Sequence, residues 1–133
     1  MLTCISLLIF TFIPHSPLAD DDIESSLRTA RGGASFIAQY LGIEEIMFCE
    51  FRMEDAGRDL ELATEKYHQS QFEDVIKQID EALNHIKICQ ESDDATYMDS
   101  NKLQDIANLV LLIKKIKKQL ALLGPTLTPQ IAH

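Results

Sequence analysis

The chain has 133 residues, with 12 Lys+Arg against 21 Asp+Glu, and a formal net charge of −9 at pH 7. This length is typical of one domain, and a hydrophobic content of 46% is enough to bury a core, which excludes wholesale disorder. The acidic balance disfavours nucleic-acid binding, because phosphate backbones are bound by clustered Lys and Arg. With only 5 Gly and 4 Pro, the chain has few turn residues for an all-β fold, so a small helical domain is expected.

Residues 1–19 differ from the rest of the chain, because they contain no Asp, Glu, Lys or Arg. The apolar run 5–13 has the length of the hydrophobic region of a signal peptide and is too short to span a bilayer. Three aspartates begin at Asp20, so we predict a signal peptide over 1–19, cleaved after Ala19. The alternative is an N-terminal helix packed in the core. No other segment reaches 18 apolar residues, so we expect no transmembrane helix and no membrane partner after cleavage.

Four segments carry apolar residues at steps of three and four, the spacing of an amphipathic helix. The first covers 22–40, where Gly32-Gly33 is expected to weaken or kink the helix and Gly42 is a plausible end. The polar stretch 68–71 separates the second helix from the third, and 91–98 is predicted to be a loop. The expected inward-facing stripes are Ile23, Leu27, Ala30, Ala34, Ile37 and Leu41; Ile46, Cys49, Met53, Ala56, Leu60, Ala63 and Tyr67; Phe72, Val75, Ile79, Ala82, Ile86 and Cys89; and Leu103, Ile106, Val110, Ile113, Ile116 and Leu120.

The ends of the last helix have their own signals. Asp99 or Ser100 can cap its start, because their side-chain oxygens accept from free backbone N–H groups. Gly124-Pro125 is predicted to end it and to leave 124–133 as a loose tail. The sequence therefore predicts an all-α fold, an antiparallel up-and-down four-helix bundle over 20–123, pinned by one disulfide. A helical-repeat array is the alternative, which a single hairpin does not support.

Two cysteines fit this hairpin. Cleavage after residue 19 removes Cys4 and leaves Cys49 and Cys89, an even number for an oxidising compartment. Facing residues of a hairpin centred near position 69 have numbers that sum to about 138, as Cys49 and Cys89 do. Both lie on inward stripes, so we predict a disulfide between them, with two buried free thiols as the alternative.

Other chemistry has weak support. Met53 and His85 also sum to 138, so a soft copper site formed by these two residues with Cys49 and Cys89, or a Met53 and His85 axial pair for haem, is an alternative, but a disulfide consumes both thiolates. Adjacent carboxylates such as Glu44-Glu45 point about 100° apart on a helix. Four lysines, Lys114, Lys115, Lys117 and Lys118, are explained by a helix C-terminus rather than by an anion site. We therefore expect no enzyme, no catalytic residue, no metal and no cofactor.

Three motifs carry a family resemblance: Cys49-x3-Met53-x2-Ala56-x3-Leu60-x2-Ala63, Phe72-Glu73-Asp74, and Ala82-Leu83-x5-Cys89. Together they resemble the plant invertase and pectin methylesterase inhibitor family, with Met53 where members have an aromatic residue. The run 108–116, with its lysines, is similar to the last helix of that family. Members carry an N-terminal helical hairpin with its own disulfide, so the resemblance is to a member shortened at its N-terminus.

The resemblance implies secretion to the plant cell wall and apoplast, a four-helix bundle, and non-covalent 1:1 inhibition by occlusion of an enzyme cleft. Pectin methylesterase is the expected target, because the Pro-Lys-Phe step frequent in invertase inhibitors is absent; acid invertase is the alternative target. A non-inhibitory secreted bundle and a metal- or haem-carrying bundle also remain open. Residues off the stripes are the expected partner-binding surface, and they are Glu50, Glu54, Asp55, Arg58, Asp59, Glu73, Asp74, Gln78 and Asp80.

Overall fold

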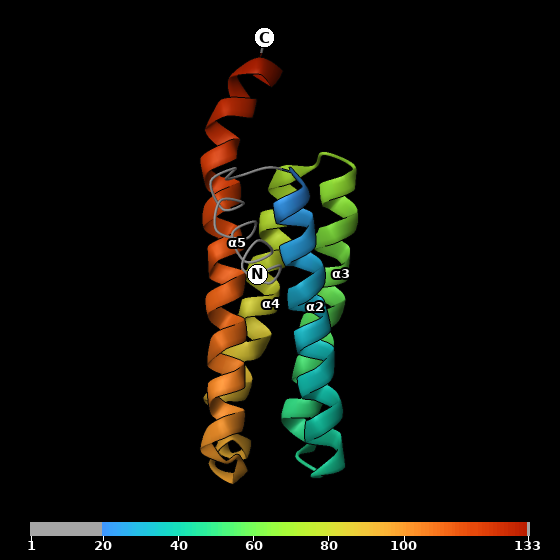
Figure 1. Ribbon diagram of the computed structural model, residues 1–133, viewed down its shortest axis with the longest axis vertical. Helices are drawn as coiled ribbons and strands as arrows, with labels where there is room; N and C mark the ends of the chain where they lie inside the picture. Colours follow the sequence, from blue (N-terminus) through green and yellow to red (C-terminus); the bar gives the residue numbers. More distant parts are fainter. Residues whose placement is uncertain (1–19, 133) are drawn as a thin grey trace, which may run out of the picture.

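The computed structural model describes the backbone of residues 20–132 and the side chains of 22–123. It contains α2 (Asp20–Ile43), α3 (Met47–His68), α4 (Phe72–Gln90), the short 3-10 helix η2 (Asp93–Tyr97) and α5 (Ser100–Ala132), with no strand in this range. Successive α-helices run in opposite directions (Figure 1). α3 packs against α2 and α4, and α5 closes the bundle against the same two helices. The predicted all-α, up-and-down four-helix bundle is confirmed, while the predicted signal peptide lies outside the described residues.

The core is built from the predicted stripes of α2, α3 and α4. Met53 and Leu60 of α3 and Ile79 and Ile86 of α4 are fully buried. Burying one such side chain contributes about 1.5–3 kcal/mol, so these four together contribute roughly 6–12 kcal/mol. Phe72 is the exception, because it lies half-buried at the start of α4, where its ring meets the Tyr67 ring edge-to-face at 5.6 Å.

α2 continues through its two glycines. Residues 20–43 form one helix, which ends one residue after the predicted end at Gly42. The expected interruption at Gly32-Gly33 is absent, because the inward residues Ala30 and Ala34 keep the 3-4 spacing on both sides of the glycines and are fully buried. A Cβ placed on Gly57 of α3 would lie 3.8 Å from the Cβ of Ala34, so small side chains let α2 and α3 approach closely.

Two tight turns reverse the chain, and each uses one residue with positive φ. Glu45 (φ 62°) lies between α2 and α3, and Ser70 (φ 59°) lies between α3 and α4. In the second turn the backbone N–H of Gln71 donates to the carbonyl of Lys66 at 2.9 Å, which satisfies a free carbonyl at the end of α3. The predicted loop over 91–98 contains η2.

The cap of α5 agrees with the prediction, but its buried stripe does not. Asp99 caps it as expected, because its Oδ1 accepts from the N–H of Lys102 at 2.8 Å. The predicted stripe is shifted, however: Leu103 is exposed, whereas Lys102 and Leu109 are buried. The regular 4-3-4-3-4 steps of 102, 106, 109, 113, 116 and 120 follow the helix better than the irregular steps from 103 do.

The predicted end of the last helix is also wrong. α5 passes through Gly124-Pro125 and ends at Ala132, so 124–132 is helical and extends past the ends of the other helices (Figure 1). A proline inside a helix removes one backbone hydrogen bond and clashes with the preceding turn, but it can kink a helix without ending it.

Candidate functional site

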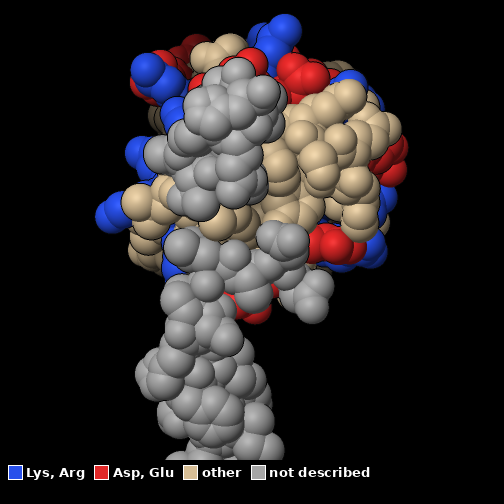
Figure 2. Space-filling model, turned by 90° about the horizontal axis from the view of Figure 1, so that it is seen from above, with Lys and Arg blue, Asp and Glu red and all other residues tan. Residues whose placement is uncertain are grey.

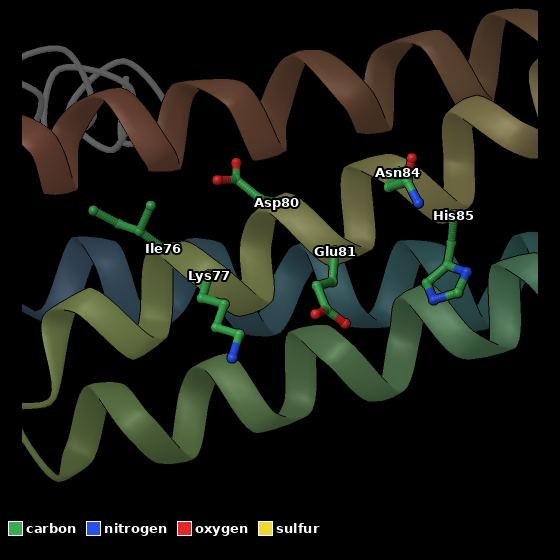
Figure 3. Close-up of a pocket in the computed structure, with 6 residues that line it drawn as sticks. All are labelled: Ile76, Lys77, Asp80, Glu81, Asn84 and His85. Carbon is green, nitrogen blue, oxygen red and sulfur yellow. The ribbon is translucent and has the colours of Figure 1, made fainter.

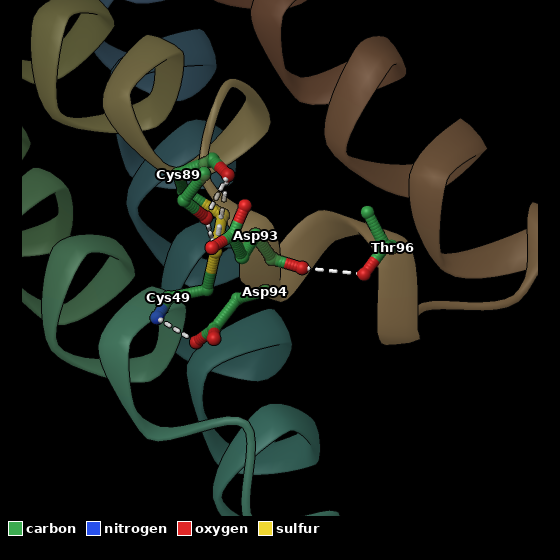
Figure 4. Close-up of a disulfide and its surroundings, with 6 residues drawn as sticks. Cys49, Cys89, Asp93, Asp94 and Thr96 are labelled. Atoms are coloured by element: carbon green, nitrogen blue, oxygen red, sulfur yellow. Dashed lines mark hydrogen bonds between the residues drawn. A yellow bond between two sulfur atoms is a disulfide. The ribbon is translucent and has the colours of Figure 1, made fainter.

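A disulfide fastens the end of the bundle at which α3 begins and α4 ends. Cys49 and Cys89 are both fully buried and are bonded to each other, with their Cα atoms 4.9 Å apart (Figure 4). This confirms the predicted bridge. Because both sulfurs are consumed, the alternatives of free thiols and of a copper site that uses both cysteine thiolates are wrong. In the part of the chain that the structure describes, no cluster of three or more His, Cys, Asp or Glu side chains is arranged to hold a metal.

η2 is tied to this bridge by Asp94 and by Ser92, the residue that precedes it. Asp94 Oδ2 accepts from the backbone N–H of Cys49 at 3.1 Å, and Ser92 Oγ donates to the carbonyl of Cys89 at 2.7 Å. The Asp94 carboxylate thus caps the first turn of α3, where the helix has unsatisfied N–H groups and a positive dipole end, in place of the apolar N-cap residue Ile46. The bridge and these two bonds hold α3, α4 and η2 as one unit.

A charged cluster lies on the surface between α3 and α4, in the half of the hairpin that is closer to the disulfide. Arg52 Nη1 lies 3.0 Å from His85 Nδ1, and Asp59 Oδ2 lies 3.5 Å from His85 Nε2. In the neutral form of His85, Nδ1 accepts from Arg52, because a guanidinium can only donate, and the Nε2 proton faces Asp59. Asp55 pairs with Arg58 and approaches Nδ1 of His85 at 4.0 Å. The side chain of His85 is 23% exposed, so it lies half-buried beside the inward stripe of α4.

Asp59 contributes a largely buried carboxylate to this cluster. Its side chain is only 14% exposed, and Oδ2 is buried without a hydrogen-bond partner. Burial raises the pKa of Asp59 above its ordinary value, and the carboxylates of Glu81 and Asp55 add to this increase, whereas the charge of His85 opposes it. A carboxylate of this kind is a candidate acid or base, so the space in front of it decides whether it can act.

The side chains that line the nearby hollow do not converge on one point. It is lined by Ile76, Lys77, Asp80, Glu81, Asn84 and His85, which all belong to α4. Lys77, Glu81 and His85 point toward α3, whereas Asp80, Asn84 and Ile76 point toward α5 (Figure 3). The side chains diverge over an open surface, which leaves no enclosed site for acid–base chemistry around His85.

The predicted partner-binding residues do not form one acidic face. Asp80 Oδ1 pairs with Lys117 Nζ of α5 at 2.7 Å, and Asp59 faces α4. Glu50 lies against Gly42 of α2, where a Cβ would meet Glu50 Oε2 at 2.7 Å. The structure thus distributes these residues over three helix seams. The side chains that remain exposed are those of Glu54, Arg58, Glu73, Asp74 and Asp80, and those of Glu50, Asp55, Asp59 and Gln78 are half-buried.

The surface at the end of the bundle with the α3–α4 turn is not uniformly acidic either. Seen from this end, charged side chains of both signs surround an uncharged area (Figure 2). The four lysines near position 116 lie within α5 rather than at its C-terminus, because the helix continues to Ala132. Their explanation by the helix dipole is therefore wrong, since that effect is confined to the last turn.

Sequence reasoning missed one buried charge. Lys102 is 5% exposed and is the only buried charged residue among residues 22–123. Its Nζ lies 3.1 Å from the ring centroid of Tyr40 and approaches Asp99 at 3.7 Å and Glu44 at 3.9 Å. This contact ties the start of α5 to the end of α2 by a cation–π interaction. The signal for it was the regular stripe that begins at position 102.

Comparison with family models, with curated proteins and with solved structures gave no match to this chain. Among the described residues, no helix combines the length and the apolar character that crossing a membrane requires.

Proposed function

We propose that this chain is a secreted protein that inhibits a cell-wall enzyme by binding over its cleft, one inhibitor to one enzyme, without covalent chemistry. Pectin methylesterase is the first target and acid invertase the second. The observation that carries the proposal is the position of the disulfide. It joins the second and third helices of a four-helix bundle across 40 residues, within the motif spacing that resembles the inhibitor family.

The build of the bundle supports a binding role. Fully buried stripes, the bridge and the Asp94 cap fix α3 and α4 before any partner arrives, so association costs little ordering of the backbone. The proposed role is not catalytic, because the titratable side chains around His85 diverge over an open surface. A secreted location also suits the bridge, since disulfides persist in oxidising compartments.

The net charge of −9 supports electrostatic attraction to a basic enzyme. Glu54, one of the nine residues expected to face the partner, is exposed, and among the described residues it makes no ion pair with a neighbouring helix. Its carboxylate is therefore available for long-range steering. Rim charges of this kind change the association rate more than the dissociation rate.

The test is a titration of purified pectin methylesterase and acid invertase with the oxidised protein, followed by binding kinetics of Glu54→Lys. This substitution should slow association several-fold and leave dissociation nearly unchanged. Added salt should slow association of the unaltered protein in the same way, because exposed charges are screened beyond about 8–10 Å at 0.1–0.15 M. The matched control is Asp105→Lys, an exposed position of α5 that changes the net charge by the same two units. Equal slowing by both variants would contradict a role for the α3 surface.

A further inference from the structure

The disulfide end of the bundle exposes a group of large apolar side chains. Ile43, Met47, Phe48, Phe51 and Tyr97, here called the aromatic corner, are 81%, 54%, 43%, 53% and 74% exposed. They are half of the ten large apolar side chains that are exposed within residues 22–123. Single exposed apolar residues are ordinary on a protein surface, but a contiguous group of them marks an interaction site.

The members of the aromatic corner lie at one end of the bundle, on the first turn of α3, on the turn that precedes it and on η2. Met47 and Phe51 are four residues apart on α3, and Phe48 and Phe51 are three apart, so their side chains lie on adjacent positions of the helix surface. Tyr97 of η2 lies beside the turn that joins Ile43 to Met47, because it lines a surface hollow of about 340 Å³ together with Glu44, Glu45, Ile46 and Asp94. Two segments that are distant in the sequence thus build one surface.

This surface is held in place before any partner binds. The Asp94–Cys49 hydrogen bond and the disulfide fix η2 against α3, as described above. The turn before α3 is closed by two backbone hydrogen bonds, from Ile46 to Leu41 at 2.9 Å and from Glu45 to Gly42 at 3.1 Å. Preorganised aromatic side chains have the features of the residues that dominate binding energy in protein interfaces.

The charge around the aromatic corner selects the partner. Residues 43–54 and 91–97 contain seven Asp or Glu and one cation, Arg52. That arginine is already engaged by His85 at 3.0 Å and by the Phe48 ring at 5.3 Å. One cation from outside these segments, Lys102, approaches this acidic set: its Nζ lies 3.9 Å from Oε2 of Glu44. An apolar centre with an acidic rim attracts a basic protein surface and repels an anionic membrane.

From these observations we infer that the aromatic corner is the centre of the partner-binding surface, and that it binds a protein surface in which Lys or Arg side chains flank an apolar pocket. The acid-lined hollow beside Tyr97 receives one of these cations, which the Tyr97 ring and the carboxylates of Glu44 and Asp94 contact together. This inference rests on the proposed function for the identity of the partner as an enzyme. It adds that apolar contacts of α3 and η2 supply the affinity, while Glu54 and other rim charges act on the association rate.

The first arm of the test measures affinity for pectin methylesterase by calorimetry, using full-length oxidised protein. Phe48→Ser/Phe51→Ser should weaken the Kd by about 30-fold or more, the loss typical of central aromatic residues. The matched control is Leu111→Ser/Leu122→Ser, two leucines of α5 that are 64% and 56% exposed, which should change the Kd by less than about 3-fold. Tyr97→Ser, a substitution outside the helices of the bundle, keeps the test valid if the α3 variant folds poorly. Equal affinities of all variants would overturn the inference.

The second arm does not depend on the enzyme. A short amphipathic peptide of Leu and Lys is titrated into the protein, and amide chemical shifts are followed by NMR. Perturbations that concentrate at Met47–Phe51 and at Tyr97 would support the inference. Perturbations that spread evenly, or that concentrate on α5, would overturn it. If the unaltered protein inhibits neither enzyme, the proposed function is wrong, and this arm alone decides the inference.

Discussion

Removal of the Cys49–Cys89 bridge by a double substitution to Ala is expected to lower the free energy of unfolding by about 4 kcal/mol. The bridged cysteines are 40 positions apart, so the bridge closes a loop of about 41 residues in the unfolded chain. The chain-entropy relation gives about 13 cal/mol/K for a loop of this length, or about 4 kcal/mol at 25 °C. That is a large fraction of the roughly 5–15 kcal/mol that stabilises a typical domain.

The assay is urea unfolding followed by far-ultraviolet circular dichroism. Ala is chosen over Ser because both positions are fully buried, where a hydroxyl without a partner would add a cost of its own. With a slope of about 2 kcal/mol/M, the unfolding midpoint should fall by about 2 M, and the slope should rise because the unfolded chain is no longer cross-linked. Reduced unaltered protein is the control and should resemble the double variant. A loss below about 1 kcal/mol with an unchanged slope would refute the reasoning.

Four further predictions test the packing. Gly32→Ala should raise the free energy of unfolding by about 0.5–1 kcal/mol, because position 32 is helical and a Cβ there meets no atom within 4 Å; a loss of stability in urea unfolding would contradict this. Leu60→Ala should cost about 2–5 kcal/mol by leaving a cavity at a fully buried site, and a cost below about 1 kcal/mol would argue against that burial. Asp59→Asn should stabilise the protein by about 1 kcal/mol near pH 7. Because the pKa of Asp59 is raised in the fold, its contribution to stability is present below its ordinary pKa and is lost as the pH rises. The stability advantage of Asn should therefore shrink toward about pH 3. An advantage that stays constant with pH would contradict the assignment. Lys102→Met should lower the urea midpoint near pH 8. Burial lowers the pKa of Lys102, but its contacts with Tyr40 and two carboxylates outweigh burial and raise the pKa above 10.5. This stabilisation should therefore be lost at still higher pH, where the urea midpoints of the two proteins should become equal. A difference between the midpoints that does not change with pH would contradict the prediction.

The hairpin of α3 and α4 could be predicted in detail because its signals are local and redundant. Two unbroken stripes of alternating three- and four-residue steps fix which side of each helix is buried. A short polar turn then fixes the register between them, so the pairing of Cys49 with Cys89 followed from arithmetic on the sequence. The structure places the two Cα atoms 4.9 Å apart, as that register requires.

The candidate surface could be predicted only in part, because it depends on tertiary contacts. That Asp80 faces α5 and Asp59 faces α4 follows from how the helices are arranged, which position relative to a stripe does not reveal. The Asp94 cap of α3 joins residues 45 positions apart and has no sequence signature. In α5 the prediction chose Leu103 for the buried stripe because leucine is apolar. Lys102 is buried in its place because its ammonium group packs on the Tyr40 ring, a tertiary contact.

The most direct test of the central claim is the activity of pectin methylesterase titrated with the secreted, oxidised protein. The proposed function predicts that inhibition reaches a plateau at one inhibitor per enzyme and is reversed by dilution, as expected for non-covalent occlusion of the cleft. It also predicts that reduction of the Cys49–Cys89 bridge weakens inhibition in step with the loss of folded protein. If folded, oxidised protein at micromolar concentration leaves both pectin methylesterase and acid invertase fully active, the proposed inhibitory function is wrong.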